Sequence, residues 1–173
     1  SGATLDIPSG ATIANAGTST GFTTDVNKPY FSAHGSSTQT VSNNTDTLIQ
    51  FNQLLNSADS ASGYNTSAYT YTVQSGGAGL WFLKAGFYFS GASSFSEGNQ
   101  VQIKLQVDNN DKINNHVFYG GQTDGWLSCN GFITLAVGNV IKLNTYQNTG
   151  GNITVYNNNN YTSQLSGFRI KAT

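Results

Sequence analysis

From residue 28 onward, short apolar runs recur along the chain, and in several of them apolar and polar residues alternate. Within residues 101–107, Val, Ile, Leu and Val occupy every second position, with Gln and Lys between them. Residues 140–145 repeat this alternation. A period of two puts the two sets of side chains on opposite faces of a strand, so both segments are predicted to be strands with one buried face.

Three further segments are less regular. Residues 80–89, LWFLKAGFYF, carry large apolar side chains at odd and even positions, which predicts a strand buried on both faces. Residues 47–58 suit a helix or a strand, and we favour the strand. Asn130-Gly131 is a strong hairpin signal. Because a turn there would leave two short stubs, we favour one continuous strand over residues 126–136.

Clusters of Gly, Asn, Asp and Ser separate the apolar runs and are typical of turns. About eight to ten short strands over residues 28–173 predict an all-β fold, a jelly-roll sandwich of antiparallel strands. A segment of this length can bury a core of its own and is interpreted as one domain.

The first 27 residues are small and polar, and they begin with a repeat in which SGATLDIP is followed by SGATIANA. Leu5, Ile7 and Ile13 hold the apolar positions of two short rungs. Repeat architectures need about three rungs to be stable, so three chains side by side would bury these residues around a shared axis. We expect residues 1–27 to be a β-repeat stalk remnant and linker, cut within the repeat and poorly ordered over its first eight residues.

Charged residues make up 9% of the 173 residues, and the net charge at pH 7 is −1. Uncharged polar residues replace the missing charges, and no apolar run approaches the roughly 20 residues that span a bilayer. The seven basic residues are scattered, which argues against nucleic acid as a partner. The single cysteine, Cys129, lies among apolar residues and is interpreted as a small core residue.

Several predicted strands carry more large apolar side chains than one sandwich can cover. Burying such a side chain against a neighbouring chain contributes about 1.5–3 kcal/mol, and cyclic symmetry repeats the gain in every subunit. We therefore predict a homotrimer. The predicted interface residues are Tyr30, Trp126, Phe132 and Leu165 in the domain and Leu5, Ile7 and Ile13 in the stalk.

Six short motifs follow one another in the order found in the globular heads of the C1q and tumour-necrosis-factor superfamily. They are KPYFSA (28–33), LIQFN (48–52), YNTS (64–67), AGFYF (85–89), VGNV (137–140) and LSGFRI (165–170). From residue 28 to about 171 the chain thus resembles this family, which implies the same jelly-roll head. Ser90, Asn139 and Leu165 depart from the residues usual at their positions, Phe, Asp and Phe.

The opening repeat is similar to repeats in bacteriophage tail-fibre and head-fibre proteins, where they precede a C-terminal knob. This second resemblance implies a trimeric appendage on the virion surface, outside the cell, with a fibre stalk upstream. It implies no insertion into a membrane.

Residues that could support catalysis are scarce. The chain has one Glu, Glu97, and two His, His34 and His116, and it contains no nucleophile elbow, zinc-protease helix or phosphate loop. We expect no enzymatic activity and no cofactor. Asp108, Asp111 and His116 are weak alternatives for a structural calcium or an ion on a threefold axis, and a plain turn is favoured at residues 108–111.

The loops combine aromatic rings with amide and hydroxyl groups, a mixture that suits glycans. Rings stack on the apolar faces of sugars, and amides and hydroxyls pair with sugar hydroxyls. Asn and Gly also simply form tight turns, so this alternative stays open for each loop. The candidate ligand-binding residues are Tyr156, Asn157, Asn158, Asn160, Tyr161, Tyr64, Asn65, Tyr69 and Tyr146.

The leading hypothesis is therefore a trimeric fibre knob that recognises a receptor on a bacterial host, first of all a glycan. Two alternatives remain. The domain is a trimerisation and folding clamp or decoration protein of a fibre without recognition of its own, or it is a cellular C1q-like lectin or adhesin.

Overall fold

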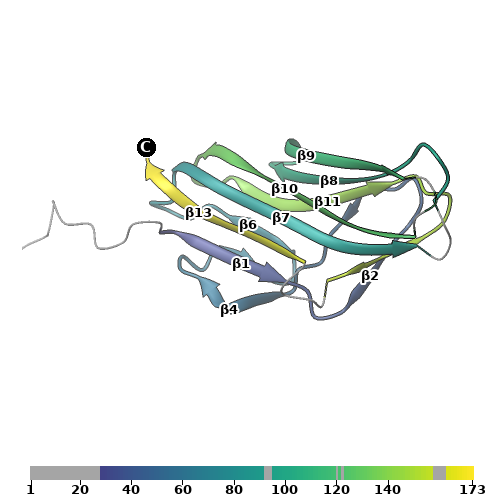
Figure 1. Ribbon diagram of the computed structural model, residues 1–173. Coiled ribbons are helices and arrows are strands. Elements are labelled where there is room, and N and C mark those ends of the chain that lie inside the picture. The colour runs from purple at the N-terminus through teal and green to yellow at the C-terminus, as the bar shows by residue number, and fades with distance from the viewer. Residues whose placement is uncertain (1–27, 92–94, 120, 122, 158–162) are drawn as a thin grey trace, which may run out of the picture.

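The computed structural model describes residues 28–91, 95–119, 121, 123–157 and 163–173 (Figure 1). The predicted stalk, with Leu5, Ile7 and Ile13, lies outside the described residues. Within the described part the chain is built of β-strands, and no helix there is long and apolar enough to cross a membrane. The all-β prediction is confirmed.

Thirteen strands are present in the described residues, more than expected, because several are stubs of two to four residues. They are β1 (Tyr30–His34), β2 (Thr38–Val41), β3 (Thr47–Leu48), β4 (Gln53–Asp59), β5 (Tyr64–Asn65), β6 (Thr70–Thr72), β7 (Gly79–Gly91), β8 (Asn99–Val107), β9 (Asn110–Tyr119), β10 (Asp124–Leu135), β11 (Val140–Gln147), β12 (Ile153–Tyr156) and β13 (Gln164–Ala172).

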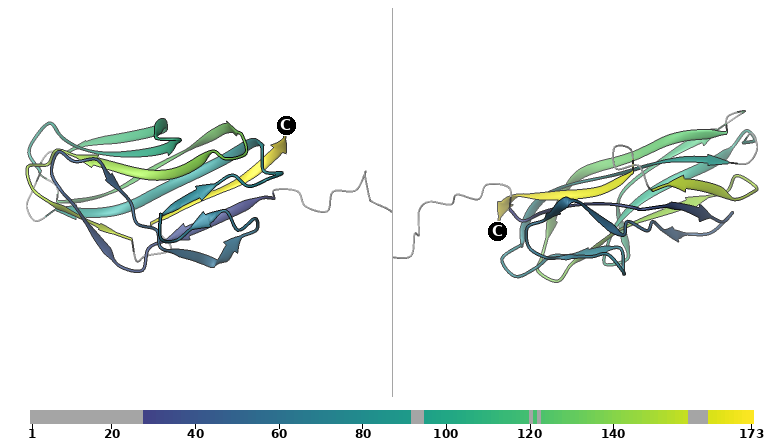
Figure 2. Two further views of the ribbon diagram at one scale, coloured as in Figure 1. Left: turned by 180° about the vertical axis from the view of Figure 1, so that it is seen from behind. Right: turned by 90° about the horizontal axis from the view of Figure 1, so that it is seen from below.

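The strands form two antiparallel sheets that pack face to face as a jelly-roll sandwich (Figures 1 and 2). The larger sheet has the order β2-β12-β7-β13-β1-β4, and β10 pairs with the other edge of β7. The smaller sheet has the order β5-β6-β11-β8-β9, with β3 beside β11. The long strand β7 organises the larger sheet, because β13 pairs with its first part and β12 with its last part.

The core lies between the two sheets and comes from alternate residues of each strand. On β8, Val101, Ile103 and Leu105 are buried, as the period-two pattern predicted. On β7 the odd-numbered residues from Trp81 to Phe89 are buried. The prediction that residues 80–89 are buried on both faces is wrong for this single chain, because the even-numbered residues face outward and Lys84 is exposed.

The favoured interpretation of the two ambiguous segments is confirmed. Residues 47–58 contain no helix: they hold strand β3 and most of strand β4, with residues 49–52 outside both strands. Strand β10 runs through Asn130-Gly131 without a turn, paired with β7 over its whole length. Gly131 has a packing role, since a Cβ atom there would lie 2.8 Å from Ile113 Cδ1.

Asp108 and Asn109 form the two-residue turn between β8 and β9. Both have positive φ, 51° and 64°, as the type I′ hairpin turn requires. The favoured interpretation of residues 108–111 as a turn is confirmed.

Candidate functional site

A row of large apolar side chains crosses the outer face of the larger sheet. Phe132 on β10, Phe82 on β7, Phe168 on β13 and Tyr30 on β1 are neighbours in successive strand pairs. Ring centroids lie 5.4 Å apart for Phe82 and Phe132 and 5.6 Å apart for Phe82 and Phe168. We call these four residues the apolar row.

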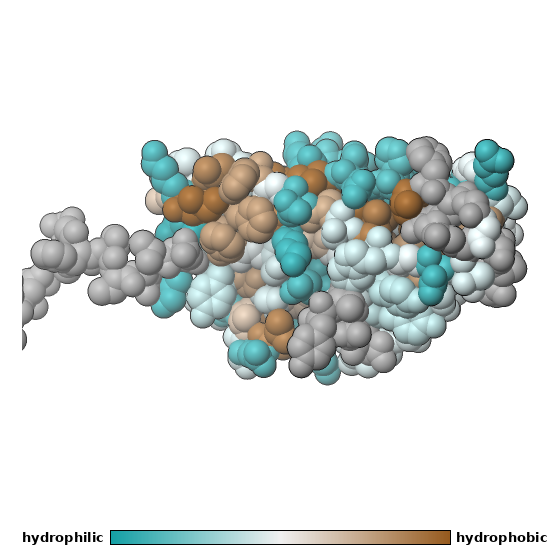
Figure 3. Space-filling model, in the orientation of Figure 1, coloured by the Kyte–Doolittle hydropathy of each residue, from teal (hydrophilic) through white to brown (hydrophobic). Residues whose placement is uncertain are grey.

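The apolar row is open to solvent in the single chain. Phe132 is 66% exposed, and Phe168, Tyr30 and the nearby Ile170 are also exposed. Figure 3 shows brown side chains gathered on this face, at the end of the sheet where β13 ends. A contiguous apolar patch of this kind typically marks an interaction surface.

A polar row separates the apolar row from the rest of the face. It contains Asn130, Lys84, Ser166 and Ser32, which are neighbours across β10, β7, β13 and β1. Lys84 is the exposed cation at its centre.

A second aromatic group lies at the opposite end of the same face. Trp126 on β10 is directly opposite Tyr88 on β7, and the Tyr88 ring packs against Tyr156 on β12 with centroids 5.4 Å apart. The Tyr88 hydroxyl donates a hydrogen bond of 2.5 Å to Asp124 Oδ2, and Ser90 Oγ shares one of 3.2 Å with the Tyr156 hydroxyl. We call Trp126, Tyr88, Tyr156, Asp124 and Ser90 the Trp126 cluster.

The electrostatics of the Trp126 cluster follow from Asp124. The hydrogen bond to this carboxylate, with burial and nearby charge adding to it, raises the pKa of the Tyr88 hydroxyl. The hydroxyl therefore stays protonated and continues to donate to Asp124 throughout the neutral range.

The candidate loop residues do not come together in one site. Tyr156 belongs to the larger sheet, whereas Tyr64, Asn65 and Tyr146 belong to the smaller one. Asn158, Asn160 and Tyr161 lie outside the described residues.

Tyr64 is a correction. It was expected to face a ligand, but its ring is buried beside Phe31 and its hydroxyl donates to Phe51 O at 2.8 Å. Burial raises the pKa of this hydroxyl. Asn65 uses Oδ1 to accept from the backbone N–H groups of Ser67 and Ala68, so it closes a turn.

Asn157 and Tyr69 also have structural roles. Asn157 is 1% exposed, and its Nδ2 donates to Gln39 Oε1 at 3.1 Å. Its side chain is therefore withdrawn from the surface, contrary to the expectation. Tyr69 is half-buried with φ of 61° and donates its backbone N–H to Asn65 O.

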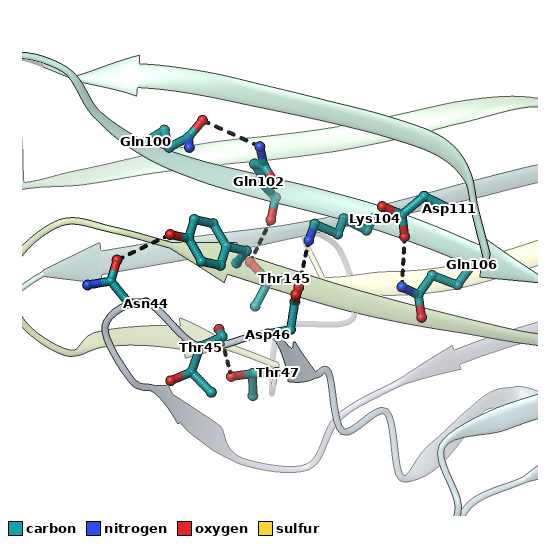
Figure 4. A network of polar contacts seen from close by, with 11 residues as sticks. Asn44, Thr45, Asp46, Thr47, Gln100, Gln102, Lys104, Gln106, Asp111 and Thr145 are labelled. Carbon is teal, nitrogen blue, oxygen red and sulfur yellow. Dashed lines mark hydrogen bonds and ion pairs between the residues drawn. The ribbon is translucent and has the colours of Figure 1, made fainter. Parts of the chain in front are cut away.

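Tyr146 lies on the outer face of the smaller sheet. Its partners Asn44 and Lys104 belong to a network of polar contacts (Figure 4). Its hydroxyl donates to Asn44 Oδ1 at 3.2 Å, and Lys104 Nζ lies 5.4 Å from its ring centroid. Lys104 also forms an ion pair of 2.7 Å with Asp46. The ring of Tyr146 is thus engaged on one side by a cation, which makes it a poorer sugar platform than Trp126.

The weak metal candidates have other partners. Asp108 accepts from Asn139 Nδ2 at 2.6 Å and from the Val140 N–H at 2.8 Å. Asp111 accepts from Gln106 Nε2. Among the described residues, no group of three or more His, Cys, Asp and Glu side chains is placed to hold a metal ion.

The predicted environment is wrong for Leu165 on β13 and confirmed for Cys129 on β10. Leu165 was predicted at a chain interface, but it points into the core with 0% exposed, because odd-numbered residues face inward at this end of β13. Cys129 is buried, as predicted, and burial raises the pKa of its thiol to about 11.

Sequence reasoning missed Phe82, Phe168, Tyr88 and Asp124. Phe82 and Tyr88 were hidden in a segment so apolar that its two faces were not told apart. Phe82, Lys84 and Tyr88 all lie at even-numbered positions of one strand and therefore on one face. The charged Lys84 among them is the signal that marks this face of β7 as the outer one.

No protein-family model matches the chain, and a search of curated proteins finds no match. Solved structures do match its fold. One is the globular domain of the zebrafish complement 1qA protein, with a TM-score of 0.57 and 14% identity over 84% of this chain and 100% of that one. The chain therefore has the jelly-roll fold of a C1q globular domain, and at this identity the likeness concerns the fold alone.

Proposed function

We propose that this chain is the non-catalytic knob of a trimeric bacteriophage fibre and that it recognises a receptor on the bacterial surface, first of all a glycan. The observation that carries the proposal is the exposed apolar row. It lies at the end of the sandwich where β1 begins and β13 ends, which is where a stalk preceding residue 28 would join the domain (Figure 1).

The apolar row supports self-association on energetic grounds. Covering a large apolar side chain contributes about 1.5–3 kcal/mol, and the row offers several of them per chain. Three copies around the axis of a stalk would each cover the row of a neighbour, because cyclic symmetry repeats the same contact. A surface position on the virion and an upstream fibre stalk follow from this proposal.

Recognition is supported by the composition of the far end of the same face. Aromatic rings, hydroxyls and one carboxylate gather there, a mixture suited to a sugar. The knob would then hold its copies together at one end and meet the host at the other.

Binding of the labelled chain to a panel of bacterial strains tests the proposal. We expect saturable binding to some strains and not to others, with competition by the unlabelled chain. Absence of binding across receptive and resistant strains would refute the recognition role and favour the clamp, for which the apolar row alone is sufficient.

A further inference from the structure

The Trp126 cluster contains an exposed indole whose ring lies beside Gly86 of the neighbouring strand. Trp126 is 45% exposed, and a Cβ atom on Gly86 would lie 3.0 Å from Trp126 Cζ2. The absence of a side chain at Gly86 thus leaves room for the indole, and part of the Trp126 surface is open to solvent. An open aromatic face is the feature on which the C–H face of a pyranose ring stacks.

Hydrogen-bonding groups lie beside this indole in fixed positions. Asp124 lies two residues before Trp126 on the same strand, and its Oδ2 accepts a hydrogen bond from the Tyr88 hydroxyl. Among the described residues no other donor reaches this carboxylate, so its Oδ1 can accept from a ligand. Ser90 is directly opposite Asp124 across the β7–β10 pair. Its hydroxyl forms a hydrogen bond with the Tyr156 hydroxyl. A carboxylate is a strong acceptor for sugar hydroxyls.

The charge of the cluster restricts the ligand. Asp124 is its only ionisable carboxylate, and it contains no cation. Lys84 lies four residues before Tyr88 on β7, about 13 Å away along the strand. An acidic polysaccharide would therefore meet the negative charge of Asp124, whereas a neutral sugar would meet no repulsion there.

Trp126 was predicted at a chain interface, but its cluster lies apart from the apolar row through which the proposed assembly forms, so in that assembly it stays accessible. Tyr88 lies six residues after Phe82 on β7, about 20 Å from the apolar row. It thus lies in the second half of β7, which runs toward the end of the sandwich opposite the start of β1 and the end of β13 (Figure 1).

From these observations we infer that the Trp126 cluster is a binding site for a neutral pyranose glycan. Trp126 provides the stacking surface, Asp124 and Ser90 pair with sugar hydroxyls, and Tyr88 and Tyr156 position them. This inference deepens the proposed function and rests on it for the source of the glycan, the bacterial surface.

The test uses the full 173-residue chain on an array of neutral and acidic bacterial polysaccharides, followed by affinity measurements on the strongest neutral one. We expect Trp126→Ala and the isosteric Asp124→Asn to lower the affinity by about tenfold or more. Val137→Ala, at an exposed apolar residue in the turn before β11, is the control and should retain the affinity. The ligand should also change the emission of Trp126, because the other tryptophan, Trp81, is fully buried.

Sedimentation of each variant shows whether a loss of affinity comes from a lost glycan contact or from dissociation of the assembly. Binding to bacterial strains tests the recognition role separately from the position of the glycan site. If native chain and Trp126→Ala bind the polysaccharide equally, the site is wrong while strain recognition stands. If Trp126→Ala dissociates the assembly, Trp126 belongs to the chain interface and the inference is overturned. Binding of acidic polysaccharides alone, or of none on the array, also overturns it. The proposed recognition role fails separately, if the native chain binds no strain.

Discussion

At the residue scale, close packing leaves some glycines no room for a side chain. A Cβ atom on Gly167 would lie 2.4 Å from Leu83 Cδ2 and 3.1 Å from Phe31 Cε1, inside the core. Gly151, in contrast, has no heavy atom within 4 Å of such a Cβ.

Gly167→Ala is therefore expected to lower the free energy of unfolding by about 1–3 kcal/mol, because overpacking displaces buried side chains. Gly151→Ala is the control and should change it by less than about 0.5 kcal/mol. Urea unfolding followed by tryptophan fluorescence measures both. Equal stability of the two variants would contradict the packing described around Gly167.

The buried thiol of Cys129 makes stability depend on pH. Its pKa is about 11 in the folded chain, against an ordinary value of 9.0. Between these values the unfolded chain loses the thiol proton and the folded chain keeps it, so the stabilisation is present below pH 9 and decreases as the pH rises towards 11.

We expect the alkaline loss of stability to be smaller in Cys129→Ala than in the native chain, by on the order of 1–2 kcal/mol across that interval. Unfolding curves at several pH values between 8 and 11 give the difference. Parallel pH profiles for the two proteins would show that the thiol is not protected by burial.

Residue-scale prediction failed where a side chain suits two environments. Tyr64 has the composition of a binding loop around it, yet a phenol whose hydroxyl can reach a backbone carbonyl is equally at home in a core. Cys129 was predicted correctly, because its apolar neighbours in the sequence favoured a core position over a reactive or interchain thiol.

At the element scale, the β8–β9 hairpin is fastened to the turn before β11. The Asp108 carboxylate accepts from Asn139 and from the Val140 N–H, so one side chain joins two turns. Asp111, two residues after the turn, accepts only from Gln106 among the described residues.

Asp108→Asn should lower the free energy of unfolding by about 1–2 kcal/mol, because the charged acceptor of these hydrogen bonds is lost. The substituted Asn can keep the positive φ of position 108, because Asn adopts this conformation readily. Asp111→Asn is the control, with an expected change below about 0.5 kcal/mol.

Excess calcium or EDTA should leave the melting temperature of the native chain unchanged. A calcium-dependent rise that Asp108→Asn abolishes would instead identify a metal site.

Element prediction succeeded where alternation was strict and failed where both positions of the alternation were apolar. Strands β8 and β11 follow directly from their patterns. The two faces of β7 could not be told apart, since an outward-facing Phe82 and an inward-facing Leu83 look the same in sequence. Strand β10 was recognised despite Asn130-Gly131, and its Gly is explained by Ile113 of a neighbouring strand, a contact that no local pattern contains.

At the scale of the whole molecule, the outer face of the larger sheet is divided into two ends of different chemistry. The apolar row lies at the end where β1 begins, and the Trp126 cluster lies beyond the polar row that contains Lys84. The order of six motifs was enough to predict the jelly roll. It could not predict this division, because residues of the two ends alternate with core residues along the same strands.

The central claim is that copies of this chain assemble through the apolar row. Sedimentation velocity at micromolar concentration tests it on the native chain, on Phe132→Asp combined with Phe168→Asp, and on Asn114→Asp as a control that adds a carboxylate to an exposed strand position of the smaller sheet. The account predicts a trimer for the native chain and the control, and folded monomers for the double variant. A native chain that sediments as a monomer, or a double variant that remains a trimer, would contradict it.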